Sequence, residues 1–418
     1  MKKLVIASGM TISIPYILST EIKLPASKSI SNRALIIRAL AGGDAPLDNI
    51  SDCDDSNVVV DALHAMPYEI DIKAAGTAMR FFTSVLATMP AEHVITGTER
   101  MCNRPIGVLV KALQSIGAEI NYVDKEGFPP LRIKGRRLSG GHICLPGNVS
   151  SQYISSLLLI APTLYNGLSL ELTGDIISRP YIDMTLGIMR QFGAKANWKT
   201  DNTIYVAPQP YKPTPYYIES DWSAASYWYE IVALSSDEEL SIVLPGLFKK
   251  SLQGDSAVVR LFSSLGVETI FEDNQVCLRK TKNRIAEFVQ DMVGQPDLAQ
   301  TFVVTCCMLG IPFNIRGLKT LRIKETDRIA ALQGELLKLG YVIHAGSDDS
   351  LSWNGEKISE IPDLDSVGID TYDDHRMAMA FAPVALTRGT IVINNPEVVS
   401  KSYPNFWQDL KKCGFKLD

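Results

Sequence analysis

The chain has 418 residues, of which 46% are hydrophobic and 21% are charged, and its formal net charge is −5. This composition is typical of a globular protein with two or three domains, and the acidic balance argues against a nucleic-acid-binding protein. No run of about twenty apolar residues occurs, and the apolar stretch near Met1 is too short for a secretory signal. We therefore expect a cytoplasmic protein that does not enter a membrane, with its seven cysteines reduced.

The first polar motif, LPASKSISNR at residues 24–33, precedes the apolar, helix-like run ALIIRAL. A serine could cap this helix, which would explain one hydroxyl. The cap does not explain the cations Lys28 and Arg33, because the positive end of a helix dipole disfavours them. An anion bound at the helix start would explain both. The motif lacks the glycines of a P-loop, so a simple cap and an anion site of another kind remain the two interpretations.

A helix–glycine–strand pattern recurs along the chain. Amphipathic segments end at a glycine, as a helix does at its C′ position, and a strand-like alternation follows. The intervals are 76, 73, 74 and 74 residues between Gly117, Gly193, Gly266, Gly340 and Gly414. Apolar helices followed by strands alternate with these segments, so six α/β units of about 74 residues are predicted. The unit before Gly117 is about 25 residues short, between Asp61 and Ala74.

The repeat length by itself does not decide whether the six units form one ring or two domains of three units each. The Pro- and Tyr-rich stretch 208–221 lies near the middle of the six and predicts a domain crossover. A cleft between two domains is then the expected place for a site.

Several expected helix starts in the N-terminal half carry hydroxyl, amide or arginine side chains. They lie in the motifs AAGTAMR, NRPI, VSSQY and SRPY, in addition to residues 24–33. Several such starts favour helix N-termini directed at one anionic ligand, although independent caps are the alternative. The residues concerned are Gly76, Arg104, Ser150, Ser151, Gln152, Ser178 and Tyr181.

The C-terminal half carries charged motifs instead. Asp297 precedes an apolar helix and could be only an N-cap, while Glu325 and Arg328 have the i,i+3 spacing of a surface ion pair. The motif DDHR, which ends at Arg376, contains a His–Asp pair without a second nearby histidine, so we do not expect a metal site. Neither a nucleophile elbow nor a dinucleotide-binding fingerprint is visible.

Together these motifs resemble the 5-enolpyruvylshikimate-3-phosphate (EPSP) synthases of the enolpyruvate transferase family, over nearly the whole chain. RIKETDR and KSISNR, in this order, are the most specific motifs. The resemblance implies an α/β fold of two domains, each with three βαβαββ-like units about a pseudo-threefold axis, an inside-out α/β barrel. It implies a C-terminal domain of residues 1–24 plus 221–418 and an N-terminal domain of residues 25–220, with the active site in the cleft between them.

The resemblance also implies a reaction. The family transfers the enolpyruvyl group of phosphoenolpyruvate to the 5-hydroxyl of shikimate 3-phosphate and releases phosphate, on the route to chorismate and the aromatic amino acids. No phosphoryl group moves, so we expect no metal and no cofactor, and we expect a monomer. Asp297 would be the base and Glu325 the acid, although the division of proton roles among these two and Lys28 stays open.

The resemblance assigns ligands residue by residue. Shikimate 3-phosphate would be held by Lys28, Ser29, Arg33, Ser150, Ser151, Gln152, Ser178, Tyr181, Asp297 and Lys324. Phosphoenolpyruvate would be held by Lys28, Gly76, Arg104, Gln152, Arg328, Arg376 and Lys401. The chain departs from the family at Ala26, Ala74, Phe81 and Thr320, where Gly, Asn, Pro and Asn are usual. We hypothesise that Phe81 shifts the helix that begins near Gly76 and weakens binding of the inhibitor glyphosate more than catalysis.

Two alternatives remain. UDP-N-acetylglucosamine enolpyruvyl transferase uses the same donor and carries a reactive cysteine a few residues before its Arg-Pro pair. Cys102 lies two residues before Arg104, but without the glycine-rich loop of that family. The other alternative is a non-catalytic protein that binds shikimate phosphate, which the shortened first unit would suggest.

Overall fold

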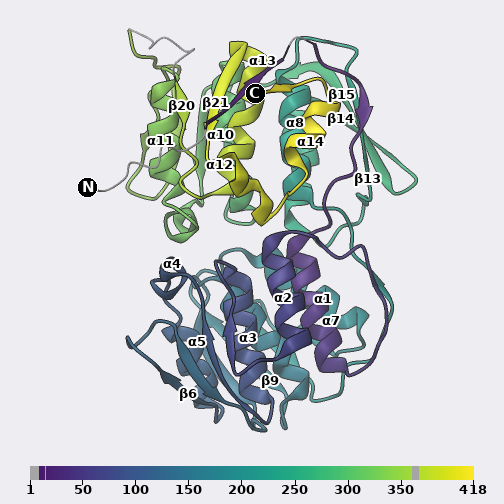
Figure 1. Cartoon of the computed structure of the whole chain (residues 1–418), viewed down its shortest axis with the longest axis vertical. Coiled ribbons are helices and arrows are strands. Elements are labelled where there is room, and N and C mark those ends of the chain that lie inside the picture. The colour runs from purple at the N-terminus through teal and green to yellow at the C-terminus, as the bar shows by residue number, and fades with distance from the viewer. Residues whose placement is uncertain (1–8, 15, 360–366) are drawn as a thin grey trace. The chain divides into compact units, whose positions relative to one another are not determined.

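The computed structural model describes residues 9–14, 16–359 and 367–418. The chain divides into two compact units. The N-terminal unit comprises Ala26–Glu219, and the C-terminal unit comprises Met1–Pro25 together with Ser220–Asp418 (Figure 1). Each unit has a hydrophobic core of its own. The second boundary, between Glu219 and Ser220, falls inside the Pro- and Tyr-rich stretch 208–221.

The described residues form five four-stranded sheets, all with the same arrangement of strands. In one of them β8 (Gly141–Pro146) pairs in parallel with β9 (Leu168–Thr173). Strand β9 pairs antiparallel with β11 (Thr203–Val206), which pairs antiparallel with β10 (Ala196–Trp198). A parallel pair followed by an antiparallel hairpin is therefore the repeated unit, and the repeat predicted from the glycine spacing is confirmed.

The other four sheets have the same strand order, and some of their strands are only two residues long. In the N-terminal unit the order is β4 (Glu69–Asp71), β5 (Glu92–Thr96), β7 (Leu131–Lys134) and β6 (Glu119–Tyr122). The C-terminal unit has three such sheets. The first contains β2 (Thr20–Glu21), β13 (Ser241–Pro245), β15 (Gln275–Arg284) and β14 (Leu265–Glu272), and the second contains β16 (Phe288–Asp291), β17 (Phe313–Arg316), β19 (Leu351–Trp353) and β18 (His344–Ala345). The third contains β20 (Gly368–Ile369), β21 (Thr390–Asn394), β1 (Gly9–Ser13) and β22 (Lys416–Leu417).

The first unit of the repeat is reduced. Strand β3 (Leu47–Asp48) pairs in parallel with β12 (Tyr216–Tyr217), and the described residues add no further strand to this sheet. After helix α2 (Asp54–Ala65) the chain passes directly to β4, where the other units place an antiparallel hairpin. The expectation that the short segment after Asp61 has lost part of the strands is confirmed.

Three helices form the interior of each unit. In the N-terminal unit they are α1 (Lys28–Ala41), α3 (Gly76–Thr88) and α6 (Ser151–Ile160), which pack on one another. In the C-terminal unit they are α8 (Trp222–Leu234), α10 (Ala299–Leu309) and α12 (His375–Phe381). Every residue of α8 except Ser223 is buried. A helix that is apolar on all sides belongs inside the core, with sheets around it, as the inside-out barrel requires.

The helices on the outside of the units precede the repeated glycines, and these helices are α5 (Gly107–Ser115), α7 (Arg179–Gln191), α9 (Val258–Ser263), α11 (Arg328–Lys338) and α14 (Phe406–Lys412). Gly117 follows α5 with φ 101°, and its N–H donates to the Gln114 carbonyl at 3.0 Å. This left-handed residue ends the helix as predicted. Gly266 differs, because it lies within β14 at an irregularity of the strand register.

The short helices complete the described chain. They are α4 (Glu99–Cys102), α13 (Ala385–Arg388), and the 3-10 turns η1 (Ala161–Thr163), η2 (Gly254–Ala257), η3 (Pro296–Leu298), η4 (Lys319–Ile323), η6 (Ala382–Val384) and η7 (Pro396–Lys401). Within the described ranges, no helix has the length and apolar character needed to cross a bilayer. All seven cysteines are free thiols.

Candidate active site

Arg33 of the N-terminal unit is buried between helices α1, α6 and α7, with 3% of its surface exposed. Its Nε donates to Thr185 Oγ1 at 2.7 Å, its Nη2 to Ser155 Oγ at 3.2 Å and its Nη1 to the Ser29 carbonyl at 2.8 Å. The charge is therefore solvated by dipoles. Burial lowers the pKa of Arg33 to about 10, because dipoles replace the lost water only in part.

Four other residues expected to bind shikimate 3-phosphate lie at the starts of α6 and α7. Ser150 is the N-cap of α6, and its hydroxyl accepts from the Gln152 N–H at 3.3 Å. Ser178 is the N-cap of α7 in a left-handed conformation, with φ 55°, and its side chain makes no cap hydrogen bond. Ser151 and Tyr181 belong to the first turns of the same helices. Strained backbone at a helix start is common at ligand sites.

Two of the residues expected to bind phosphoenolpyruvate meet at the start of α3. A Cβ atom added at Gly76 would lie 2.5 Å from Arg104 Nη1, so only glycine allows Arg104 this close approach. Gln152 Nε2 donates to Thr77 Oγ1 at 3.2 Å, which brings the start of α6 to the same place. The motif NRPI was expected at a helix start, but the helix after Arg104 begins only at Gly107.

Arg80 stabilises the contact between Gly76 and Arg104, and it is buried, with 3% of its surface exposed. Its Nη1 donates to the Gly76 carbonyl at 3.2 Å and its Nη2 to the Pro105 carbonyl at 3.1 Å. The sequence showed only that a cation follows Gly76. The tertiary structure shows that this cation fastens the loop of Arg104 to helix α3.

Lys28 is the first residue of α1, and its Nζ lies 3.1 Å from Asp55 Oδ2 in the first turn of α2. Both side chains are largely buried, at 17% and 15% exposure. Ser27 is the N-cap of α1 but makes no side-chain cap bond, so capping does not account for the serines of this motif. Sequence reasoning did not find Asp55, which stands in an acidic run that is equally suited to a helix first turn.

Arg328 is the centre of an ion-pair network in the C-terminal unit, and its side chain is 1% exposed. Its Nε lies 2.6 Å from Asp374 Oδ2, its Nη1 2.9 Å from Asp297 Oδ1 and its Nη2 2.9 Å from Glu325 Oε2. The coulombic effect of the three carboxylates raises the pKa of Arg328 although burial opposes it. Glu325 and Arg328 do form the i,i+3 ion pair, but Arg328 is buried. The alternative that this is only a surface ion pair is therefore wrong.

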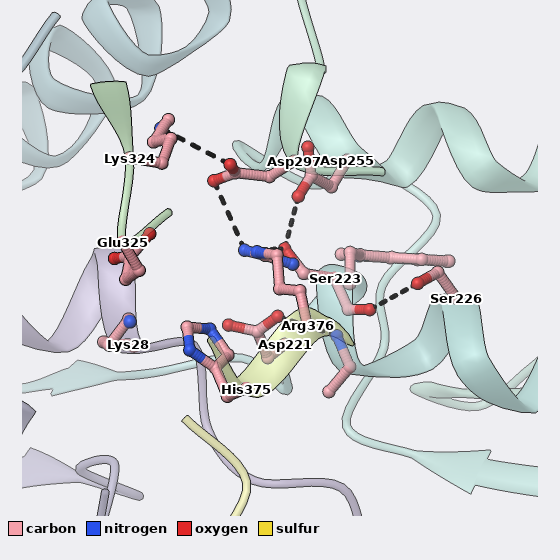
Figure 2. A network of polar contacts seen from close by, with 12 residues as sticks. Lys28, Asp221, Ser223, Ser226, Asp255, Asp297, Lys324, Glu325, His375 and Arg376 are labelled. Carbon is pink, nitrogen blue, oxygen red and sulfur yellow. Dashed lines mark hydrogen bonds and ion pairs between the residues drawn. The ribbon is translucent and has the colours of Figure 1, made fainter. Parts of the chain in front are cut away.

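Asp297 faces three cations, of which Figure 2 labels Lys324 and Arg376. Besides Arg328, its carboxylate lies 3.3 Å from Arg376 Nη2 and 3.4 Å from Lys324 Nζ. It belongs to η3, and the N-cap of α10 is Leu298, so the interpretation of Asp297 as only an N-cap is wrong. Its side chain remains 14% exposed.

Lys401 lies at the end of η7, and its Nζ donates to the Asp373 carbonyl at 2.7 Å. Asp373 and Tyr372 both have φ 55°, so the loop before α12 contains two consecutive left-handed residues. Glu325 is 25% exposed and accepts from Arg328. The structure thus brings together, within the C-terminal unit, Asp297, Lys324, Glu325, Arg328 and Arg376.

Asp374 and Asp255 were not among the predicted site residues. Asp374 is fully buried, caps α12 by accepting from the Arg376 N–H at 2.9 Å, and binds Arg328. Its place before an apolar helix was a signal for a cap, but not for an ion pair 46 residues away. Asp255, in η2, has no motif around it that would single it out. Over the described ranges, no cluster of three or more His, Cys, Asp or Glu side chains is arranged to hold a metal ion.

Comparison with known structures places the fold. The chain superposes on an EPSP synthase from Acinetobacter baumannii with a TM-score of 0.78 and 20% identity, over 98% of this chain and 100% of that one. It superposes on the enolpyruvyl transferase NikO from Streptomyces tendae with a TM-score of 0.73 and 15% identity, over 99% of each chain. The fold is therefore that of the enolpyruvyl transferases.

Sequence comparison places the family. The family model for EPSP synthase (3-phosphoshikimate 1-carboxyvinyltransferase) matches residues 12–71 and 66–410. A 3-phosphoshikimate 1-carboxyvinyltransferase of Bacteroides fragilis (strain YCH46) is 56% identical over 406 residues, which cover 97% of this chain and 98% of that protein. One of Aliivibrio fischeri (strain MJ11) is 37% identical over 420 residues, covering 94% and 96%. The chain belongs to the EPSP synthase family.

Proposed function

We propose that this chain transfers the enolpyruvyl group of phosphoenolpyruvate to the 5-hydroxyl of shikimate 3-phosphate and releases phosphate. Family membership over nearly the whole chain supports this reaction. The observation that carries the proposal is the Asp297 carboxylate among three cations, beside Glu325 on Arg328. Two polyanionic substrates need cations, and a hydroxyl that attacks carbon needs a base.

Each unit would supply part of the binding site. The helix starts around Arg33 would hold shikimate 3-phosphate, with Lys324 and Asp297 of the C-terminal unit. The pair of Gly76 and Arg104 would hold phosphoenolpyruvate, with the cations of the C-terminal unit. The full proposed set is Lys28, Ser29, Arg33, Ser150, Ser151, Gln152, Ser178, Tyr181, Asp297 and Lys324 for the acceptor, and Lys28, Gly76, Arg104, Gln152, Arg328, Arg376 and Lys401 for the donor.

Proton transfer would use the two carboxyl groups of the C-terminal unit. Asp297 takes the proton of the 5-hydroxyl while that oxygen bonds to C2 of the donor, and Glu325 gives a proton to the methylene carbon. The C–O bond to phosphate then breaks and a methyl proton leaves, so the enol double bond forms again. Lys28 carries charge that would stabilise the phosphate as it departs.

The test is phosphate release from phosphoenolpyruvate with shikimate 3-phosphate, in the presence of a chelator. We expect release that depends on the acceptor and persists with chelator. The variants Asp297→Ala and Glu325→Ala should each lose at least about a hundredfold in kcat. Glu272→Ala, which removes an exposed carboxylate at the β14–β15 hairpin, is the matched control and should keep full activity.

Two outcomes would contradict the proposal. Release that requires the UDP-sugar acceptor would identify a UDP-N-acetylglucosamine enolpyruvyl transferase instead. Binding of shikimate 3-phosphate in calorimetry without any release would identify a non-catalytic binding protein. We further propose that the enzyme is a cytoplasmic monomer, which light scattering of the purified chain and fractionation of cells would test.

A further inference from the structure

Asp255 is a buried acid that neither the sequence motifs nor the proposed reaction uses. It lies in η2, and 4% of its surface is exposed. Its Oδ2 accepts a hydrogen bond from Ser223 Oγ in the first turn of α8. Its Oδ1 is buried and has no hydrogen-bond partner among the described residues. A buried carboxyl oxygen without a partner is costly, so its presence beside the site calls for a physical explanation.

Ser223 links this acid to the proposed active site. Its oxygen accepts from Arg376 Nη2 at 3.5 Å while its proton is donated to Asp255. The same Arg376 nitrogen lies 3.3 Å from Asp297 Oδ2. Asp255, Ser223, Arg376 and Asp297 therefore form one continuous chain of polar contacts within the C-terminal unit, as Figure 2 shows.

The turn that carries Asp255 is fastened to the start of α8. Gln253 Oε1 accepts from the Trp222 N–H at 3.0 Å, and its Nε2 donates to the Ser220 carbonyl at 2.8 Å. Gln253 is 4% exposed, so both bonds are shielded from water. These bonds hold Asp255 at a fixed position relative to Ser223, which makes the contact a built feature of the fold rather than a chance meeting of surface side chains.

The charge of Asp255 changes near neutral pH. Burial and then the charge of Asp297 raise the pKa of Asp255 to about 7, whereas Arg376 and the Ser223 hydrogen bond act in the opposite direction. Asp221, the N-cap of α8, is the remaining charged group that acts on it and raises its pKa further. Below this pH Asp255 is neutral, and Arg376 keeps its contact with the Asp297 carboxylate. Above this pH the ionised Asp255 also attracts the Arg376 guanidinium, through the hydroxyl of Ser223.

We propose that Asp255 is a positioning residue which, through Ser223, sets the orientation of Arg376 and the positive charge that it offers to an anionic donor substrate. The inference rests on the proposed function, in which Arg376 binds phosphoenolpyruvate. Ionised Asp255 competes with the substrate for Arg376, so the KM for phosphoenolpyruvate increases as pH rises through neutrality. Asp255 reaches Asp297 only through Ser223 and Arg376, so kcat is affected less than KM.

The experiment measures kcat and KM for phosphoenolpyruvate at saturating shikimate 3-phosphate, from pH 5.5 to 8.5. Wild type is compared with Asp255→Asn, which mimics the neutral acid at every pH. We expect the ratio of wild-type KM to variant KM to be near one at pH 5.5 and to rise roughly tenfold by pH 8.5. Titration of the substrates themselves is common to both proteins and cancels in this ratio.

Two further variants complete the test. Ser223→Ala removes the hydroxyl through which Asp255 acts on Arg376, so the rise of the KM with pH should be much smaller than in wild type. This variant keeps the inference testable if Asp255→Asn does not fold. Glu230→Gln changes a fully buried acid of helix α8 and should leave the dependence of KM on pH unchanged.

The outcomes separate the inference from the reaction. A KM ratio that stays constant with pH, or a rise of KM in Ser223→Ala as large as that in wild type, overturns the role of Asp255 while the wild type remains active. A wild type that releases no phosphate with shikimate 3-phosphate overturns the proposed function, and the role of Asp255 with it. A structural role alone would lower activity by the same factor at every pH.

Discussion

Two buried arginines, one in each unit, are held in opposite ways. Arg33 of the N-terminal unit is surrounded by hydroxyls and a carbonyl, and burial lowers its pKa to about 10. Arg328 of the C-terminal unit is surrounded by three carboxylates, which raise its pKa. Dipoles leave a net positive charge that an anion can use, whereas carboxylates neutralise it.

The different partners of Arg33 and Arg328 indicate that the two units have different roles. The N-terminal unit offers helix starts, hydroxyls and the cation Arg33, which donates to hydroxyls and a carbonyl, and this suits the binding of phosphate and carboxylate groups. The C-terminal unit holds its proton-transfer candidates in a charge-balanced network. Arg328 would then act in binding mainly by fixing Asp297 and Glu325, because its own donors are already used within the protein.

The largest effect is expected from Arg328→Met. This change leaves three carboxylates near one another in a buried site without their shared cation, which should cost about 3–5 kcal/mol in the free energy of unfolding of the C-terminal unit. Urea denaturation followed by tryptophan fluorescence would measure it. Arg33→Met is the matched variant in the other unit and should cost less, about 1–2 kcal/mol. Equal losses would remove the contrast between the two arginines.

The next effect concerns the pH dependence of stability. The pKa of Asp255 in the folded state is about 7, above the ordinary value of 3.8, so folding favours the protonated acid. Its contribution to stability is complete below about pH 4 and is lost as pH rises toward 7. Asp255→Asn should therefore be more stable than wild type at pH 8, by a few kcal/mol at most, and nearly equal to it at pH 4. Urea unfolding at the two pH values checks this, and a constant difference would contradict it.

Gly76→Ala should separate binding from folding. The added Cβ would lie 2.5 Å from Arg104 Nη1, so the guanidinium must move. We expect the KM for phosphoenolpyruvate to rise about tenfold, while the free energy of unfolding changes by less than about 1 kcal/mol, since alanine favours the helix. Gly334→Ala is the control within α11, where the nearest atom, a tyrosine hydroxyl, is 3.7 Å away. An unchanged KM would show that binding of phosphoenolpyruvate does not depend on the observed position of Arg104.

The smallest effect is expected at Phe81, whose ring centroid lies 5.4 Å from the Arg33 guanidinium carbon. Phe81→Leu removes this cation–π contact, which is worth about 0.5–2 kcal/mol. The dissociation constant of shikimate 3-phosphate should therefore rise a few-fold in calorimetry. Inhibition by glyphosate, measured on Phe81→Leu and Phe81→Pro, tests the separate hypothesis about helix α3. An inhibition constant that matches the wild type in both variants would reject that hypothesis.

Much of the fold could be predicted from local patterns. The left-handed glycines such as Gly117 and Gly340 end helices through bonds to residues within the preceding turn, so neighbouring residues are enough to predict them. The short segment after Asp61 could be counted, and the missing hairpin followed from it. Gly266 was the exception, because strand pairing with a distant segment placed it inside β14.

The sequence by itself determined the repeat, most of the helix starts and the family to which the charged motifs belong. The tertiary structure decided which charges meet. Arg33 reaches Thr185 across 152 residues, Arg328 reaches Asp374 across 46, and Ser223 reaches Asp255 across 32. Helix caps and periodicity depend on bonds between near neighbours, whereas ion pairing and burial depend on packing of distant segments. For that reason the motif could name Arg328 as a ligand, but only the fold could make it the centre of a network.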